Sequence, residues 1–184
     1  MDPMTFLEAL LLAVLLPAWL AAGFADYLCH AALRIEKDVG WREPALHALM
    51  LVELAIGLAA VLLLEVNALV IALFAAICLV HEVTLVVDLS YASKHRQVPA
   101  FEQWVHGVQH AIPWMVLVVI AAMRPDQALA LLGVRDAIAL WMLQPRVTPW
   151  PLWYLLALAI VGSLLVGLPF LHELGRSIRF HLPR

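Results

Sequence analysis

The chain has 184 residues, of which 65% are hydrophobic and 14% are charged, with a net charge of -3 and a mean hydropathy of +0.94. Soluble domains contain about half apolar residues, so this composition excludes an ordinary soluble protein and predicts an all-α integral membrane helical bundle. No basic stretch indicates a nucleic-acid partner. The length suits one compact unit, and we expect a single transmembrane domain over residues 1–184. Cys29 and Cys78 lie in apolar runs and are interpreted as buried small side chains.

A helix needs about 20 predominantly apolar residues to cross a bilayer. Five segments meet this requirement, and we predict transmembrane helices over residues 4–33, 44–64, 68–91, 101–123 and 150–171. The N-terminal segment lacks a positively charged start, so we interpret it as a retained helix and not as a cleaved signal peptide.

Residues 128–143 are apolar but carry Arg135 and Asp136 near their centre. The segment is too short and too charged for a comfortable span. We therefore predict an amphipathic helix at the membrane interface, with a re-entrant segment as the alternative.

Acidic and histidine side chains gather at matching ends of the first four predicted helices. Asp26 and His30 close the first, Glu43 and His47 open the second with Glu53 further in, His81, Glu82 and Asp88 close the third, and Glu102, His106 and His110 open the fourth. Consecutive helices of an up-and-down bundle reverse direction, so we expect these side chains to meet in one layer. An ionisable residue at bilayer depth is costly and indicates a functional site.

The spacing within each group places its members on one helix face. Asp26 and His30 are four residues apart, as are Glu43 and His47, and such pairs lie one above the other. Carboxylate and imidazole together suit iron, zinc or manganese. We therefore predict a site for two metal ions, built by four of the helices. Its predicted ligands are Asp26, His30, Glu43, His47, Glu53, His81, Asp88, Glu102, His106 and His110.

Several residues near this layer have other predicted roles. Glu82 lies about 100° around its helix from His81, so it could pair with a neighbouring helix. We assign it a catalytic role and leave open whether it is a metal ligand. Tyr91 is predicted to be a proton or electron donor. His95 and His172 are left open as further ligands, whereas His181 flanks the basic C-terminus and fits a headgroup contact.

Three arginines surround the layer in the sequence. Arg34, Arg42 and Arg96 could simply fix the orientation of the chain in the membrane. As the alternative, they could form a clamp that binds the carboxylate or anionic headgroup of a substrate.

The stretch His106-Gly-Val-Gln-His110 resembles one box of the histidine-box membrane di-iron enzymes, which include lipid desaturases and hydroxylases. The resemblance covers this one helix and the general architecture, and the chain has no His-x-x-His-His box. The Glu-x-x-x-His spacing also differs from the Glu-x-x-His motif of soluble di-iron bundles. The resemblance implies oxygen-dependent chemistry on a hydrophobic substrate.

Our main hypothesis is a membrane-bound di-iron oxidoreductase that uses dioxygen to attack a lipid-like substrate and receives electrons from a soluble donor. One alternative is a zinc-dependent hydrolase or isomerase, in which a metal-activated water attacks the substrate. Another is a haem b electron carrier with two axial histidines. A metal transporter would place its ligands near the midplane between repeats, whereas here the ligands lie toward one end and no repeat is visible.

The 11 Lys and Arg residues are distributed unevenly between the two sides. Only Arg124, Arg135 and Arg146 lie opposite the polar layer, and the other eight lie on its side. Cytoplasmic loops of membrane proteins are enriched in Lys and Arg. We therefore predict a bacterial-type inner membrane protein with its N-terminus outside, and with the metal layer and the C-terminus at the cytoplasmic face.

This orientation is tested by labelling introduced cysteines with a membrane-impermeant thiol reagent. Cysteine at position 37 or 94, replacing Lys37 or Lys94 in a chain without other cysteines, should react only from the cytoplasmic side. Labelling of either position in intact cells from outside would overturn the predicted orientation.

Overall fold

The computed structural model of the protein describes residues 2–134 and 138–181. Within these residues, five helices are long and apolar enough to cross a membrane, which confirms the predicted all-α membrane bundle and makes the chain a multi-pass membrane protein. Their bounds are Pro3–Leu33, Arg42–Leu63, Ala68–His95, Ala100–Met123 and Leu152–His181.

The first and the last of these helices are interrupted. The first consists of α1 (Pro3–Ala9), the π-helical segment η1 (Leu10–Leu15) and α2 (Leu16–Leu33). The last consists of α7 (Leu152–Gly162), the π-helical segment η3 (Ser163–Gly167) and α8 (Leu168–His181). In both, a proline follows the π-helical segment closely, at Pro17 and Pro169. Proline lacks the N–H that would bond the preceding turn, so the widened turn accommodates the missing hydrogen bond.

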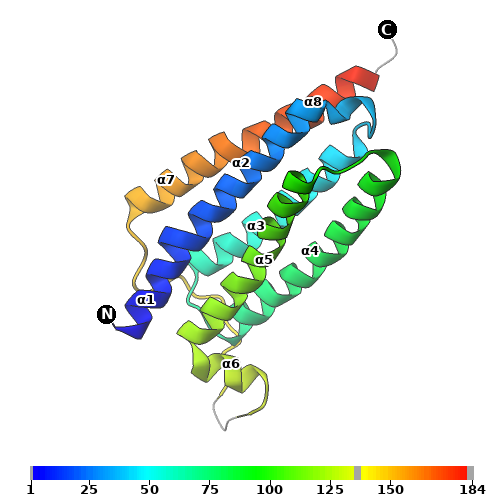
Figure 1. Cartoon of the computed structure of the whole chain (residues 1–184). Coiled ribbons are helices and arrows are strands. Elements are labelled where there is room, and N and C mark those ends of the chain that lie inside the picture. Colours follow the sequence, from blue (N-terminus) through cyan, green and yellow to red (C-terminus); the bar gives the residue numbers. More distant parts are fainter. Residues whose placement is uncertain (1, 135–137, 182–184) are drawn as a thin grey trace.

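The middle helices are α3 (Arg42–Leu63), α4 (Ala68–His95) and α5 (Ala100–Met123). The short 3₁₀ helix η2 (Ile35–Lys37) follows α2, which is capped by Arg34 in the left-handed conformation. In Figure 1 the chain reversals α2–α3 and α4–α5 and the end of α8 lie at one end of the bundle, and α6 lies at the other. This arrangement brings the polar ends of the helices to one level.

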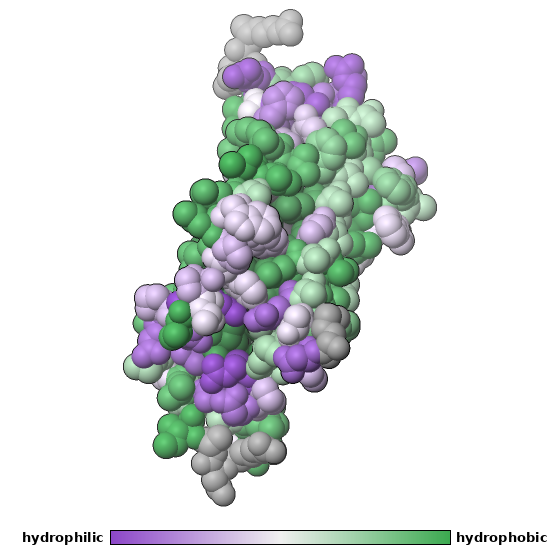
Figure 2. All heavy atoms as spheres, turned by 90° about the vertical axis from the view of Figure 1, so that its left-hand side faces the viewer, coloured by the Kyte–Doolittle hydropathy of each residue, from purple (hydrophilic) through white to green (hydrophobic). Residues whose placement is uncertain are grey.

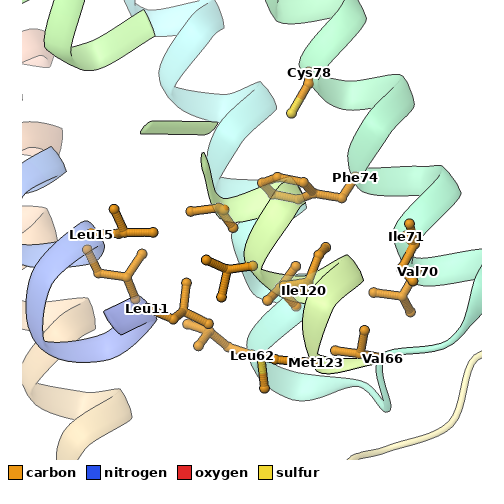
Figure 3. Packing of buried hydrophobic residues seen from close by; sticks show 14 of the residues in the cluster. Leu11, Leu15, Leu62, Val66, Val70, Ile71, Phe74, Cys78, Ile120 and Met123 are labelled. Atoms are coloured by element: carbon orange, nitrogen blue, oxygen red, sulfur yellow. The ribbon is translucent and has the colours of Figure 1, made fainter. Parts of the chain in front are cut away.

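The hydrophobic core fills the half of the bundle away from those polar ends. Leu11, Leu62, Phe74, Ile120 and Met123 belong to one buried cluster (Figure 3). The packing of α3 on α4 is close within it, because a Cβ added at Gly57 would lie 3.0 Å from the ring of Phe74. The outer surface is apolar over its middle on the face that Figure 2 shows, with hydrophilic residues gathered toward the two ends.

The segment after α5 differs from the predicted interfacial helix over 128–143. A shorter helix, α6 (Pro125–Leu131), ends just before Gly133, whose φ is 67°. From residue 138 the chain is irregular because its backbone hydrogen-bonds to the turn between α3 and α4. The amide of Leu140 donates to the Gln127 side chain at 2.9 Å, and the amide of Glu65 donates to the carbonyl of Gln144 at 2.9 Å. Arg135 and Asp136, the charges on which the prediction relied, lie outside the described residues.

Candidate metal centre

The centre of the polar layer is a group of four side chains from three helices. Asp26 and His30 come from the last turns of α2, His47 from the first turns of α3 and His106 from the first turns of α5. One potential ligand atom of each lies within 4.8 Å of the others. Asp26 Oδ1 accepts a hydrogen bond from His106 Nε2 at 2.9 Å and lies 3.4 Å from His30 Nε2. The predicted juxtaposition of these three helices is therefore confirmed.

Two further carboxylates contact the histidines of this group. Glu102 Oε1 lies 3.1 Å from His30 Nε2, and Asp88 Oδ2 lies 3.1 Å from His47 Nε2. Both carboxylates are 1% exposed. Because Asp88 is on α4, all four of the helices that were predicted to build the site contribute to it.

Arg96, in the loop between α4 and α5, is held between two acidic side chains. Its Nη2 donates to Glu43 Oε1 at 2.6 Å and its Nη1 donates to Glu102 Oε2 at 3.0 Å. The side chain is 4% exposed. Burial opposes the charge of the guanidinium, but the hydrogen bonds to Glu102 and Glu43 outweigh this effect and raise the pKa of Arg96.

These contacts correct the predicted arginine clamp. The guanidinium of Arg96 is already bound by carboxylates of the protein, so it is not free to bind an anionic substrate. Arg34 is exposed and lies 3.6 Å from Glu36, and Arg42 is exposed at the start of α3. Neither of them reaches the buried group.

Glu173 of α8 also belongs to the site, although it was not among the predicted ligands. Both of its carboxylate oxygens contact His30 Nδ1, at 3.0 and 3.1 Å, and the residue is fully buried. Phe170, Glu173 and Ser177 follow a spacing of three and four residues, and all three are buried. This helical periodicity continues beyond the predicted end of the last span at residue 171, and it could have revealed the role of Glu173.

A second set of predicted ligands lies deeper in the bundle. His81 Nδ1 is 3.4 Å from Glu53 Oε2, and Thr84 Oγ1 donates to the other oxygen of Glu53 at 2.7 Å. His110 Nδ1 is 3.4 Å from Glu82 Oε2. Glu82 therefore pairs with a neighbouring helix, and the hydrogen bond from Trp114 at 3.4 Å holds it there.

A cavity of about 60 Å³ connects the central group to this second set. It is lined by polar side chains of both, among them Asp26, His47, His81, His106 and His110. Two buried atoms of the two sets, His47 Nδ1 and Asp88 Oδ1, have no hydrogen-bond partner in the structure. Three more, Glu53 Oε2, His81 Nδ1 and His110 Nδ1, have only the 3.4 Å contacts just given, which lack hydrogen-bond geometry. Buried polar atoms without a partner are rare and call for an explanation such as a bound ion.

The remaining candidates lie apart from the cavity. The hydroxyl of Tyr91 donates to the carbonyl of Val39 at 2.8 Å, and its ring stacks on His95 with centroids 4.1 Å apart. The structure thus does not bring Tyr91 together with the predicted ligands, because its hydroxyl is directed to the α2–α3 connection. His172 pairs with the hydroxyl of Tyr27 at 3.2 Å, and His181 contacts the carbonyl of Ser177.

Fold and site together define a multi-pass membrane protein with a buried histidine–carboxylate cluster at one end of its helical bundle. Comparisons of the chain with protein-family models, with curated proteins and with solved structures found no match.

The ion pairs of Arg96 can be tested by measuring how its replacement changes the thermal stability of the protein. Replacing Arg96 by Ala removes the cationic partner of Glu43 and leaves Glu102 with histidine partners only, and loss of one partner from a buried ion pair costs about 3–5 kcal/mol. We expect a clear loss of thermal stability in detergent for chelator-treated Arg96→Ala protein. The control Arg42→Ala removes an exposed arginine and should shift stability by less than about 0.5 kcal/mol. Equal unfolding temperatures of the two variants would contradict the ion-pair assignment.

Proposed function

We propose that the protein is a membrane-bound metalloenzyme whose polar layer binds two iron ions and oxidises a lipid-like substrate with dioxygen. The observation that carries the proposal is the convergence of Asp26, His30, His47 and His106 in one buried group with a cavity beside it. Mixed histidine and carboxylate sets of this kind are typical ligands of iron, zinc and manganese.

The charges of the layer support bound cations. The carboxylates of Asp26, Glu43, Asp88, Glu102 and Glu173 are each at most 3% exposed, and the buried guanidinium of Arg96 contacts two of them, Glu43 and Glu102. Uncompensated charges at bilayer depth are strongly unfavourable. The excess negative charge requires protons on the histidines or metal ions, and two divalent ions would offset it.

The hydrogen bond of His47 leaves one of its ring nitrogens available to a metal ion. When Asp88 accepts a hydrogen bond from His47 Nε2, the lone pair of His47 is left on Nδ1, which has no partner. Glu173 contacts Nδ1 of His30, whereas Nε2 of His30 faces Asp26 at 3.4 Å and Glu102 at 3.1 Å, so an ion bound at Nε2 would have both carboxylates beside it. A carboxylate on one ring nitrogen is the usual partner of a metal-binding histidine, because it fixes the tautomer and the ring orientation.

The positions of the ligands suggest where each ion would be held. Asp26, His30, His47 and His106 form the first site. The side chains of Glu53, His81 and His110 form the second, and Asp88 lines the cavity that the two sites share. Glu102 and Glu43 are bound by Arg96, so in this arrangement they orient other side chains and are not free ligands.

Iron is favoured over zinc because carboxylates compensate the charge added on oxidation. With five buried acids near the histidines, the layer can stabilise both the ferrous and the ferric state. Iron would supply the redox chemistry. The protein would orient the substrate, hold a proton on Glu82 beside His110 and exclude water. The haem alternative fits less well, because the rings of His30 and His47 stack at 4.8 Å with no space for a porphyrin between them.

Metal content tests the site directly. In protein purified in detergent, His106→Ala removes a central ligand and should reduce bound iron from about two ions per chain to one or less. His181→Ala is the matched control, because His181 contacts only a backbone carbonyl outside the cavity. Equal metal content in the wild type and both variants would refute the assignment. Stoichiometric zinc in the wild type would support the hydrolase alternative.

Oxygen chemistry tests the reaction class. Reduced wild-type protein should consume dioxygen and gain near-ultraviolet absorption from carboxylate-bridged ferric ions without a Soret band, and His106→Ala should do neither. Oxygen uptake is measured with an electrode, and the absorption is followed in the same sample. Protein that acts on a lipid ester or amide without oxygen or reductant would overturn the proposal.

A further inference from the structure

An apolar groove runs along the membrane-facing side of the bundle next to the metal cavity. It has a volume of about 450 Å³, which lies within the range of small-molecule sites. The groove lies between α2, α3 and the last helix, which Figure 1 shows alongside α2. Apart from Ser163 its lining is apolar, and small residues widen it: Ala55, Ala59, Ala159, Gly162 and Gly167.

The groove adjoins the cavity of the metal centre. Trp19, Leu51 and Val166 line both spaces and form the boundary between them. From there the groove follows α3 as far as Leu63, which is about 18 Å along the helix axis at 1.5 Å per residue. It therefore leads from the polar layer into the apolar half of the membrane.

The dimensions of the groove indicate which kind of molecule it can bind. A volume of about 450 Å³ over about 18 Å gives a cross-section of about 25 Å². This is wide enough for one hydrocarbon chain. A helix with side chains is about 10–12 Å across and needs roughly three times this area, so the groove does not seat a helix of a second copy.

We propose that the groove binds the hydrocarbon tail of a single-chain amphiphile and places the carbons near its polar end at the metal cavity. The inference rests on the proposed function, and it deepens that function by naming the class and the orientation of the substrate. A lipid of the membrane leaflet beside the polar layer already has this orientation, with its polar end at the level of the cluster and its tail toward the membrane centre. Gln109, whose side chain lines the cavity, offers an amide to the polar end.

Binding of spin-labelled stearic acid, followed by electron paramagnetic resonance in detergent, tests the proposal. The wild type should show an immobilised fraction that saturates near one probe per chain. Ala159→Phe fills the groove and should weaken this binding at least tenfold. Ala157→Phe is the matched control, because Ala157 is on the same helix but is exposed and does not line the groove. Its binding should equal that of the wild type.

The position of the label tests the orientation. In protein loaded with Mn²⁺, a nitroxide near the carboxyl end should be broadened more than one near the methyl end. The reverse order would overturn the proposed orientation.

Three results would overturn the groove assignment. The first is unsaturable binding that is equal in all variants, which would mean that bulk lipid fills the groove. The second is loss of binding in Gly107→Phe but not in Ala159→Phe, because Gly107 lines a different groove between α4 and α5. The third is a change of oligomeric mass in Ala159→Phe, which would indicate a contact between copies.

Metal analysis of the same samples separates the two proposals. Iron retained in Ala159→Phe together with lost probe binding supports both. Saturable binding to a wild type that purifies without metal would count against the proposed function while supporting the groove. Iron-loaded wild type without saturable binding would overturn the groove alone.

Discussion

The excess of negative charge buried at one end of the bundle is the constraint on which the rest of this structure depends. Asp26, Asp88 and Glu102 approach the histidines of the central group, and Glu173 approaches it from the last helix. An ionised carboxylate at this depth needs a compensating positive charge and hydrogen bonds to offset its loss of hydration. Arg96 provides one such charge from a loop rather than from a helix. The chain must therefore bring five helix ends and one loop to the same level.

The apolar half of the molecule makes this convergence possible. The close packing of Gly57 against Phe74 fixes α3 on α4, and Ile120 and Met123 fix α5 on both. Protein interiors pack at high density and deform little. A helix fixed along its apolar half therefore presents its polar end at a defined position. The cluster and the hydrophobic core are in this sense two ends of one rigid arrangement, and the cavity lies at the boundary between them.

Much of this arrangement was predictable from the sequence because it follows from helical periodicity. The four-residue spacing of Asp26 and His30 determined their common face, and the alternating direction of the helices determined the common layer. Glu173 was missed because its helix continues past the apolar run, which marks the membrane and not the end of the helix. The pairing of Arg96 with two carboxylates and the direction of the Tyr91 hydroxyl depend on contacts between segments that are distant in the sequence. The spacing of residues along one helix carries no information about such contacts. The irregular course of the chain from residue 138 similarly depends on hydrogen bonds to the α3–α4 turn.

The two sides of the cavity differ in chemistry, and this difference gives the site a direction. Trp19, Leu51 and Val166 separate it from an apolar groove that faces the membrane. His106 and His110 line both the cavity and a groove between α4 and α5, and this second groove also contains serine and glutamine side chains. A hydrocarbon gains free energy by leaving water and therefore fits the first groove, whereas water and other polar molecules are better accommodated in the second. The histidine–carboxylate cluster thus lies where an apolar and a polar surface of the bundle come together.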